Sequence, residues 1–116
     1  MKQCIGEAAT AAKGEGAVYV VVQHRFSNPE LAFARGERLI KNEGAPEGAQ
    51  GLQFYPSRDG SAATCLWQAP SVQAIQEYVD STLGDSSEND CYEVDAEHAF
   101  AVVPATISAG PAAARI

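Results

Sequence analysis

The sequence predicts an α+β domain of the ferredoxin-like class, βαββαβ, with a four-stranded antiparallel sheet and two helices on one face. Two observations lead to this class. Short β-branched and aromatic runs alternate with longer runs at helical spacing, in the order β-α-β-β-α-β. The 116 residues, 46% of them hydrophobic, are enough for one core. We expect a flexible segment at 1–16, the domain at 17–104 and a flexible tail at 105–116, because both ends are rich in Ala and Gly.

The first strand is predicted over residues 17–26, a β-branched and aromatic run that is too short for a surface helix. A helix follows, because Asn28 can cap its first turn, Pro29 suits the first helical position and Glu30 complements the helix dipole. Residues 42–44, Asn-Glu-Gly, end this helix. Its expected apolar positions are Ala32, Phe33, Gly36, Leu39 and Ile40.

A hairpin comes next, with strands at 52–55 and 62–67 joined by the turn sequence Pro-Ser-Arg-Asp-Gly. Ser71 is the natural N-cap of a second helix, and Gly84 ends it. The apolar stripe of this helix comprises Val72, Ile75, Tyr78, Val79 and Leu83.

The last part of the domain is predicted as a polar loop at 85–90 followed by a strand at 91–95. The apolar run at 99–103 either extends the sheet or crosses it.

The first and third strands are apolar on both faces. Val18, Val20 and Val22 point to one side of the first strand, whereas Tyr19 and Val21 point to the other. Two helices cover only one face of a sheet, so we expect a second sheet to cover the other, as a face-to-face homodimer.

Three stretches of the chain carry a family resemblance: Val-Gln-His-Arg-Phe in the first strand, Cys-Leu-Trp-Gln-Ala-Pro-Ser-Val-Gln-Ala-Ile at 65–75, and Tyr-Glu-Val-Asp at 92–95. With these the chain resembles small dimeric α/β-barrel proteins over residues 17–96. Within this group it resembles an actinobacterial-type family of largely unknown function that includes a nickel-binding member. The resemblance implies a ferredoxin-like fold and dimerisation.

The chain is acidic, since eight Lys and Arg face fifteen Asp and Glu for a net charge of −7. An acidic surface repels phosphate, so we expect no nucleic-acid partner and no membrane-surface helix. No apolar run approaches the roughly 20 residues that span a bilayer. Three cysteines without a CxxC pair argue against a disulfide framework or zinc ribbon, and residues 1–16 lack the apolar region of a secretory signal. Reduced thiols indicate a cytoplasmic protein.

His24 is the first candidate functional residue, because a polar ring inside an apolar strand needs a partner and suits proton transfer or metal ligation. The alternative is a histidine bonded to the backbone or half-exposed. Its neighbours Gln23 and Arg25 favour the mouth of a dimer cavity over the core. His98 lies in a polar stretch, and we expect it to be exposed.

Cys65 and Trp67 share one face of the third strand and are candidates for pocket walls, with Cys65 as a soft metal ligand beside His24. The plain alternative is a buried small hydrophobe and a core aromatic. Tyr55 and Tyr92, with Tyr19, could each aim a hydroxyl into the lumen, although strand tyrosines often serve packing alone.

The acidic run from Asp85 to Glu97 does not match a calcium loop, because Asp90 stands where the sixth position requires Gly and Ala96 where the twelfth requires Glu. We interpret it as a solvated loop and strand edge.

Three functions fit these observations. The first is a protein that binds a small ligand, or a soft divalent metal such as nickel, in the lumen of a dimeric α/β barrel. The second, by analogy with relatives of that fold, is a cofactor-independent monooxygenase- or isomerase-like enzyme, with His24 transferring protons and Trp67 as an aromatic wall. The third is a structural homodimer without a ligand. We rank them in this order, and the sequence alone identifies no catalytic residue.

Overall fold

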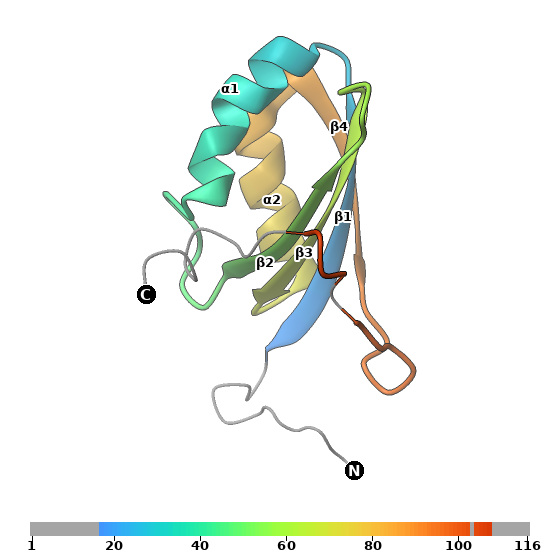
Figure 1. Cartoon of the computed structure of the whole chain (residues 1–116). Helices are drawn as coiled ribbons and strands as arrows, with labels where there is room; N and C mark the ends of the chain where they lie inside the picture. The colour runs from blue at the N-terminus through green and yellow to red at the C-terminus, as the bar shows by residue number, and fades with distance from the viewer. Residues whose placement is uncertain (1–16, 103, 108–116) are drawn as a thin grey trace.

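The computed structural model describes residues 17–102 and 104–107, and the predictions for 1–16, Val103 and 108–116 lie outside the described residues. Two helices lie side by side against one face of a four-stranded sheet, and in Figure 1 the other face has no layer over it. The fold is therefore ferredoxin-like, as predicted. The elements are β1 (Val18–Phe26), α1 (Pro29–Ile40), β2 (Gln50–Pro56), β3 (Ala62–Ala69), α2 (Val72–Leu83), the 3₁₀ turn η1 (Gly84–Ser86) and β4 (Ser87–Glu93).

The strand order is β2-β3-β1-β4, and every neighbouring pair is antiparallel. The two central strands, β1 and β3, pair over eight positions from Val18 with Ala69 to Arg25 with Ala62. These are also the most apolar strands of the chain, which agrees with their place inside the sheet.

The core lies between the sheet and the helices. Val20 and Val22 of β1 are fully buried there, and Cys65, Trp67 and Ala69 of β3 join them. The residues between them along each strand point to the open face, which follows from the two-residue period of a strand.

Helix α1 begins as predicted, because the Asn28 side chain accepts a hydrogen bond from the Leu31 backbone N–H and Pro29 occupies the first turn. It ends before Asn42, whose φ of 62° is left-handed. Its buried residues are Ala32 and Leu39.

The predicted apolar stripe of α1 is too wide. Phe33 and Ile40, which we expected in the core, are exposed. Phe33 contacts the ring of Phe26 at the end of β1 at a centroid distance of 5.3 Å. Ala32 and Leu39 therefore face the core, while Phe33 and Ile40 lie on a neighbouring, exposed side of the helix.

The β2–β3 hairpin turns where the sequence predicts it. The Asp59 carboxylate accepts hydrogen bonds from the Ser61 backbone N–H, the Ser61 hydroxyl and the Ser57 hydroxyl. These bonds, those of Ser61 first, hold the pKa of Asp59 at about 2. Gly60 follows at a φ of +79°, a conformation that favours glycine.

Helix α2 also matches its prediction. The Ser71 hydroxyl accepts a hydrogen bond from the Ala74 backbone N–H, and Gly84 ends the helix at a φ of 57°. The buried residues are Ile75, Tyr78, Val79 and Leu83.

The polar loop predicted at 85–90 is wrong in its second half, because β4 already begins at Ser87 and ends at Glu93 instead of Asp95. The polar residues of this strand alternate in direction. Glu88 and Asp90 pair with Arg25 and Gln23 on the open face, and Asn89 pairs with His24 on the helix side. An edge strand can carry polar residues on both faces, so polarity alone did not identify a loop.

The run expected to extend or cross the sheet does not form a strand in its described part, residues 99–102. It follows a short turn at 96–98 and is exposed.

Candidate functional site

The sheet divides the five predicted ligand-binding residues into two groups. His24, Cys65 and Trp67 are buried on the side that the helices cover. Tyr55 pairs with Thr64, and Tyr92 pairs with Val21, on the open face. The five side chains therefore cannot line one common cavity.

His24 and Cys65 do lie in contact. The Nε2 atom of His24 is 3.2 Å from the Sγ atom of Cys65, and Nδ1 is 2.7 Å from Oδ1 of Asn89. Because an amide oxygen only accepts, Nδ1 carries the proton and Nε2 accepts from the thiol. Asn89 is held in turn by the Ser87 hydroxyl and by the Asp80 carboxylate, which accepts from its amide at 2.8 Å.

Both ring nitrogens of His24 thus have protein partners, and the residue is only 5% exposed. The preference for a place at the cavity mouth is wrong. Gln23 and Arg25 do point to the open face, but the alternation of the strand turns the residue between them into the core.

The order thiol, imidazole, amide is also that of a cysteine nucleophile with its base and an orienting asparagine. The pKa values of the two groups differ from those of an activated cysteine and its base. Burial raises the pKa of Cys65 to about 12, with the nearby Cys91 thiol adding to the effect. Burial also lowers the pKa of His24, against the opposing effects of Asn89 and Asp80. Both groups are neutral at pH 7, so the arrangement is a satisfied hydrogen-bond network of the core and not an activated thiol.

The same network does not fit the soft divalent metal for which His24 and Cys65 were the predicted ligands. A buried soft metal is held by three or four protein ligands, whereas here Cys65 and His24 bond to each other and Nδ1 of His24 bonds to Asn89. Among the described residues, no third His, Cys, Asp or Glu lies within ligand distance of His24 and Cys65. Neither side chain is free to hold an ion.

A group of possible metal ligands does occur elsewhere in the described chain, at Asp95, Glu97 and His98. All three are exposed, as expected for His98, and His98 Nδ1 lies 2.8 Å from the Asp95 carboxylate. This agrees with a solvated acidic turn.

Trp67 is a core residue and not the wall of a lumen. Its ring packs edge-on against Tyr78 at a centroid distance of 5.7 Å, and it lies over Gly51 of β2. A side chain at Gly51 would point at the indole. The indole N–H of Trp67 is buried without a hydrogen-bond acceptor among the described residues.

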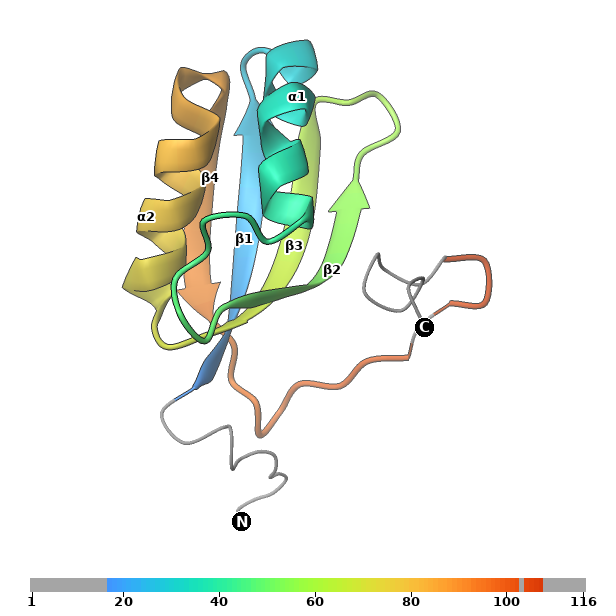
Figure 2. The ribbon, with the colours of Figure 1, turned by 90° about the vertical axis from the view of Figure 1, so that its left-hand side faces the viewer.

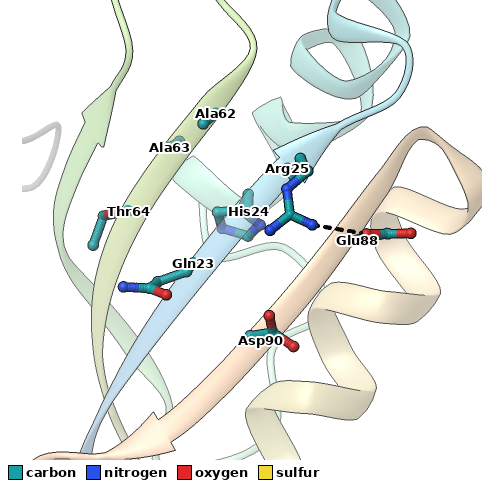
Figure 3. Close-up of a pocket in the computed structure, with 8 residues that line it drawn as sticks. All are labelled: Gln23, His24, Arg25, Ala62, Ala63, Thr64, Glu88 and Asp90. Carbon is teal, nitrogen blue, oxygen red and sulfur yellow. Dashed lines mark hydrogen bonds and ion pairs between the residues drawn. The ribbon is translucent and has the colours of Figure 1, made fainter.

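The open face of the sheet carries the one hollow that we consider a candidate site (Figure 3). It has a volume of about 250 Å³ and spans β1, β3 and β4 near the end of β1. Of these strands β1 lies in the middle, and the hollow is lined by small residues of β3 and by polar side chains of β1 and β4. The lining residues are Gln23, Arg25, Ala62, Thr64, Glu88 and Asp90, together with the backbone of His24 and Ala63, whose side chains are buried on the helix side.

Arg25 and Glu88 form an ion pair at 3.1 Å along the border of this hollow. The pair is well exposed, so it contributes little stability and remains available to other groups. Among the described residues, no hydrogen bond or ion pair engages the Asp90 carboxylate, which points to the same side.

Aromatic and apolar residues flank the hollow. Tyr55 lies beside Thr64 on β2, and Tyr92 lies beside Val21 on β4. Val21 and Leu66 pair at the centre of the open face and are half-buried. The open face is therefore polar at one end and apolar in the middle.

Sequence reasoning missed Gln23, Arg25, Thr64, Glu88 and Asp90 as site residues. A signal was present: in β1, Gln23 and Arg25 follow Tyr19 and Val21 at steps of two, on the face that two helices leave uncovered. His24 and Cys65 were chosen for the chemistry of their side chains, without regard to the face of the sheet on which they lie.

Comparison with known proteins does not identify a family for this chain. No family model matches the chain, and no curated protein matches it. Its structure is similar to that of a monooxygenase from the gene ActVA-Orf6 of Streptomyces coelicolor, solved in complex with the ligand Nanaomycin D. The two are 17% identical, and the match covers 82% of this chain and all of the other at a TM-score of 0.38. A likeness this distant carries no argument about activity, so the fold rests on the strand order itself.

No helix in the described part of the chain has the length and apolar character that a bilayer crossing requires.

Proposed function

We propose that the chain is a binding protein that holds a small organic molecule on the open face of its sheet, between two copies of the chain. The observation that carries the proposal is the uncovered face itself. Both helices lie on the other side, and yet this face has Val21 and Leu66 at its centre and Tyr19, Tyr55 and Tyr92 around them. A sheet with apolar residues on its solvent side favours coverage by a partner.

The hollow at the polar end of this face supports a ligand with hydrogen-bond donors. The carboxylates of Asp90 and Glu88 accept, and the amide of Gln23 and the hydroxyl of Thr64 both donate and accept. The tyrosines and Leu66 next to them suit an apolar ring. The expected ligand is therefore a small ring compound that carries a hydroxyl or amino group.

We do not propose a reaction. The enzyme hypothesis gave His24 the role of proton transfer and Trp67 that of a wall, and both side chains are buried on the helix side. A metal-binding function is not proposed either, because the pair His24 and Cys65 does not fit an ion.

The test combines native mass spectrometry with ligand-observed NMR. Untagged protein should appear as a dimer, and a panel of small phenols and aromatic amines should give saturation-transfer signals. Thr64→Trp fills the hollow and should remove these signals. Gln73→Trp, which places the same indole at an exposed position of α2, should leave them unchanged. A monomer at micromolar concentration, or equal signals from both variants, would contradict the proposal.

A further inference from the structure

We infer that residues 99–102 form an arm that binds along strand β2 of a second copy of the chain, an inference that rests on the proposed homodimer. The arm carries two large apolar side chains, Phe100 at 94% and Val102 at 86% exposure. In an extended segment, residues two apart point to the same side, so both can enter one surface. Single exposed apolar residues are common, but two adjacent ones on one side of an extended segment suit an interface.

Strand β2 offers the matching surface. It is an edge strand, so one row of its backbone N–H and C=O groups has no partner strand and can pair with an added one. Its seven residues include no charged side chain. Leu52 is 40% exposed, Phe54 38% and Tyr55 37%.

The other edge, β4, is unsuitable because of its charge. Glu88, Asp90 and Glu93 lie along it. The segment that leads to the arm carries Asp95 and Glu97, so binding at β4 would bring carboxylates together. Strand β2 has no charged side chain, so binding there brings no carboxylates together.

The arm does not cover β2 of its own subunit, although it could reach it. Figure 2 shows the chain leaving the end of β4 and passing below the sheet toward the β2 side. The sheet is about 14 Å wide from β4 to β2. The chain leads to the β2 side even though residues 96–98 form a turn. Phe100 and Leu52 nevertheless both stay exposed within one chain, so both are available for contact with a second copy.

The area of the interface gives a second reason. The open face is four strands wide and seven residues long, which corresponds to roughly 450 Å² of flat area per copy. Two such faces approach the lower limit of about 1,200 Å² for a stable interface only when the relief of their side chains is counted. A phenylalanine buries about 200 Å², so an arm from each copy brings the interface well into the stable range.

Analytical ultracentrifugation measures the contribution of the arm to dimer affinity. We expect Phe100→Ser to raise the dimer Kd at least tenfold and Val102→Ser to raise it several-fold. Ile40→Ser removes an exposed apolar side chain from α1, on the helix side, and should leave the Kd unchanged.

Photocross-linking identifies the contact. Phe100→p-benzoylphenylalanine is prepared with ¹⁴N and ¹⁵N, the two preparations are mixed, and cross-linked peptides are analysed by mass spectrometry. Cross-links to the peptide that contains β2 should join one ¹⁴N and one ¹⁵N chain.

The outcomes separate the two proposals. A monomeric wild-type protein overturns the proposed homodimer and the arm with it. A wild-type dimer whose Kd is unaffected by Phe100→Ser overturns the arm alone. Cross-links confined to one isotope would show docking within a subunit and would equally contradict exchange between copies.

Discussion

The imidazole of His24 accepts the thiol proton of Cys65 across the two central strands, with Nε2 and Sγ 3.2 Å apart. The two residues are diagonal neighbours, since His24 pairs with Ala63 and Cys65 with Val22. His24 and Cys65, which the sequence analysis predicted as metal ligands, are therefore part of the core. The predictions below concern this contact, the pKa values of His24 and the cysteines, and the N-cap of α2.

His24→Ala should lower the free energy of unfolding by about 1–3 kcal/mol, because it removes buried volume and leaves Asn89 and Cys65 without their partner. Chemical denaturation followed by circular dichroism measures the change. His98→Ala, at an exposed histidine, should change stability by less than about 0.5 kcal/mol. Ligand binding on the open face should persist in both variants. A stable His24→Ala protein that has lost binding would contradict the structural role.

Stability should fall as the pH drops below about 6.5. Burial lowers the pKa of His24 in the folded state, so the unfolded chain binds a proton near its ordinary value of 6.5 while the folded chain does not. The loss continues until the pH reaches the folded pKa, at a slope of up to about 1.4 kcal/mol per pH unit. Urea unfolding between pH 7.5 and pH 5 should show this slope in the wild type and a much flatter one in His24→Gln. Equal slopes would refute the assignment.

The thiols should be slow to react in the folded protein. Burial raises the pKa of Cys65 to about 12 and that of Cys91 to about 11, so thiolate is scarce at pH 8. In a Cys4→Ser variant, an aromatic disulfide reagent should label the half-exposed Cys91 first and Cys65 only on unfolding. Preferential labelling of Cys65 would mean that His24 activates the thiol.

Ser71→Ala should destabilise the protein by about 1 kcal/mol, because the first turn of α2 loses the hydroxyl that accepts from the Ala74 N–H. The matched control lies in the same helix. Ser81 donates only to the carbonyl of Tyr78, so Ser81→Ala should change stability by less than about 0.5 kcal/mol. Thermal melting of both variants distinguishes the cap from a general effect of removing a hydroxyl.

The strand and helix order could be predicted from local chemistry. Asn28 and Ser71 cap the two helices, and Gly60 allows the tight turn, so the elements begin and end near the expected residues. The exception is β4, whose Ser87 and Asn89 are polar for a reason that lies far away in the sequence. Asn89 accepts from His24 on β1 and Ser87 donates to Asn89, and no local pattern in the sequence indicates these partners.

The site was harder to predict than the fold. Alternation along β1 puts Gln23 and His24 on opposite faces, but it does not say which face the helices cover. That choice depends on the packing of α1 and α2, which buries His24 and leaves Gln23 and Arg25 exposed. Residue chemistry directed attention to His24 and Cys65, whereas the open face needed the three-dimensional arrangement.

The position of Trp67 has a consequence for optical experiments. It is the chain's single tryptophan, 2% exposed, and it lies on the helix side of the sheet. Its fluorescence should therefore emit in the blue when the protein is folded and shift to the red as the core opens, which gives a direct signal of unfolding. A molecule bound beside Gln23 and Asp90 lies on the other side of the backbone layer and does not contact the indole. Quenching by such a molecule would report a disturbance of the core, not occupancy of the open face.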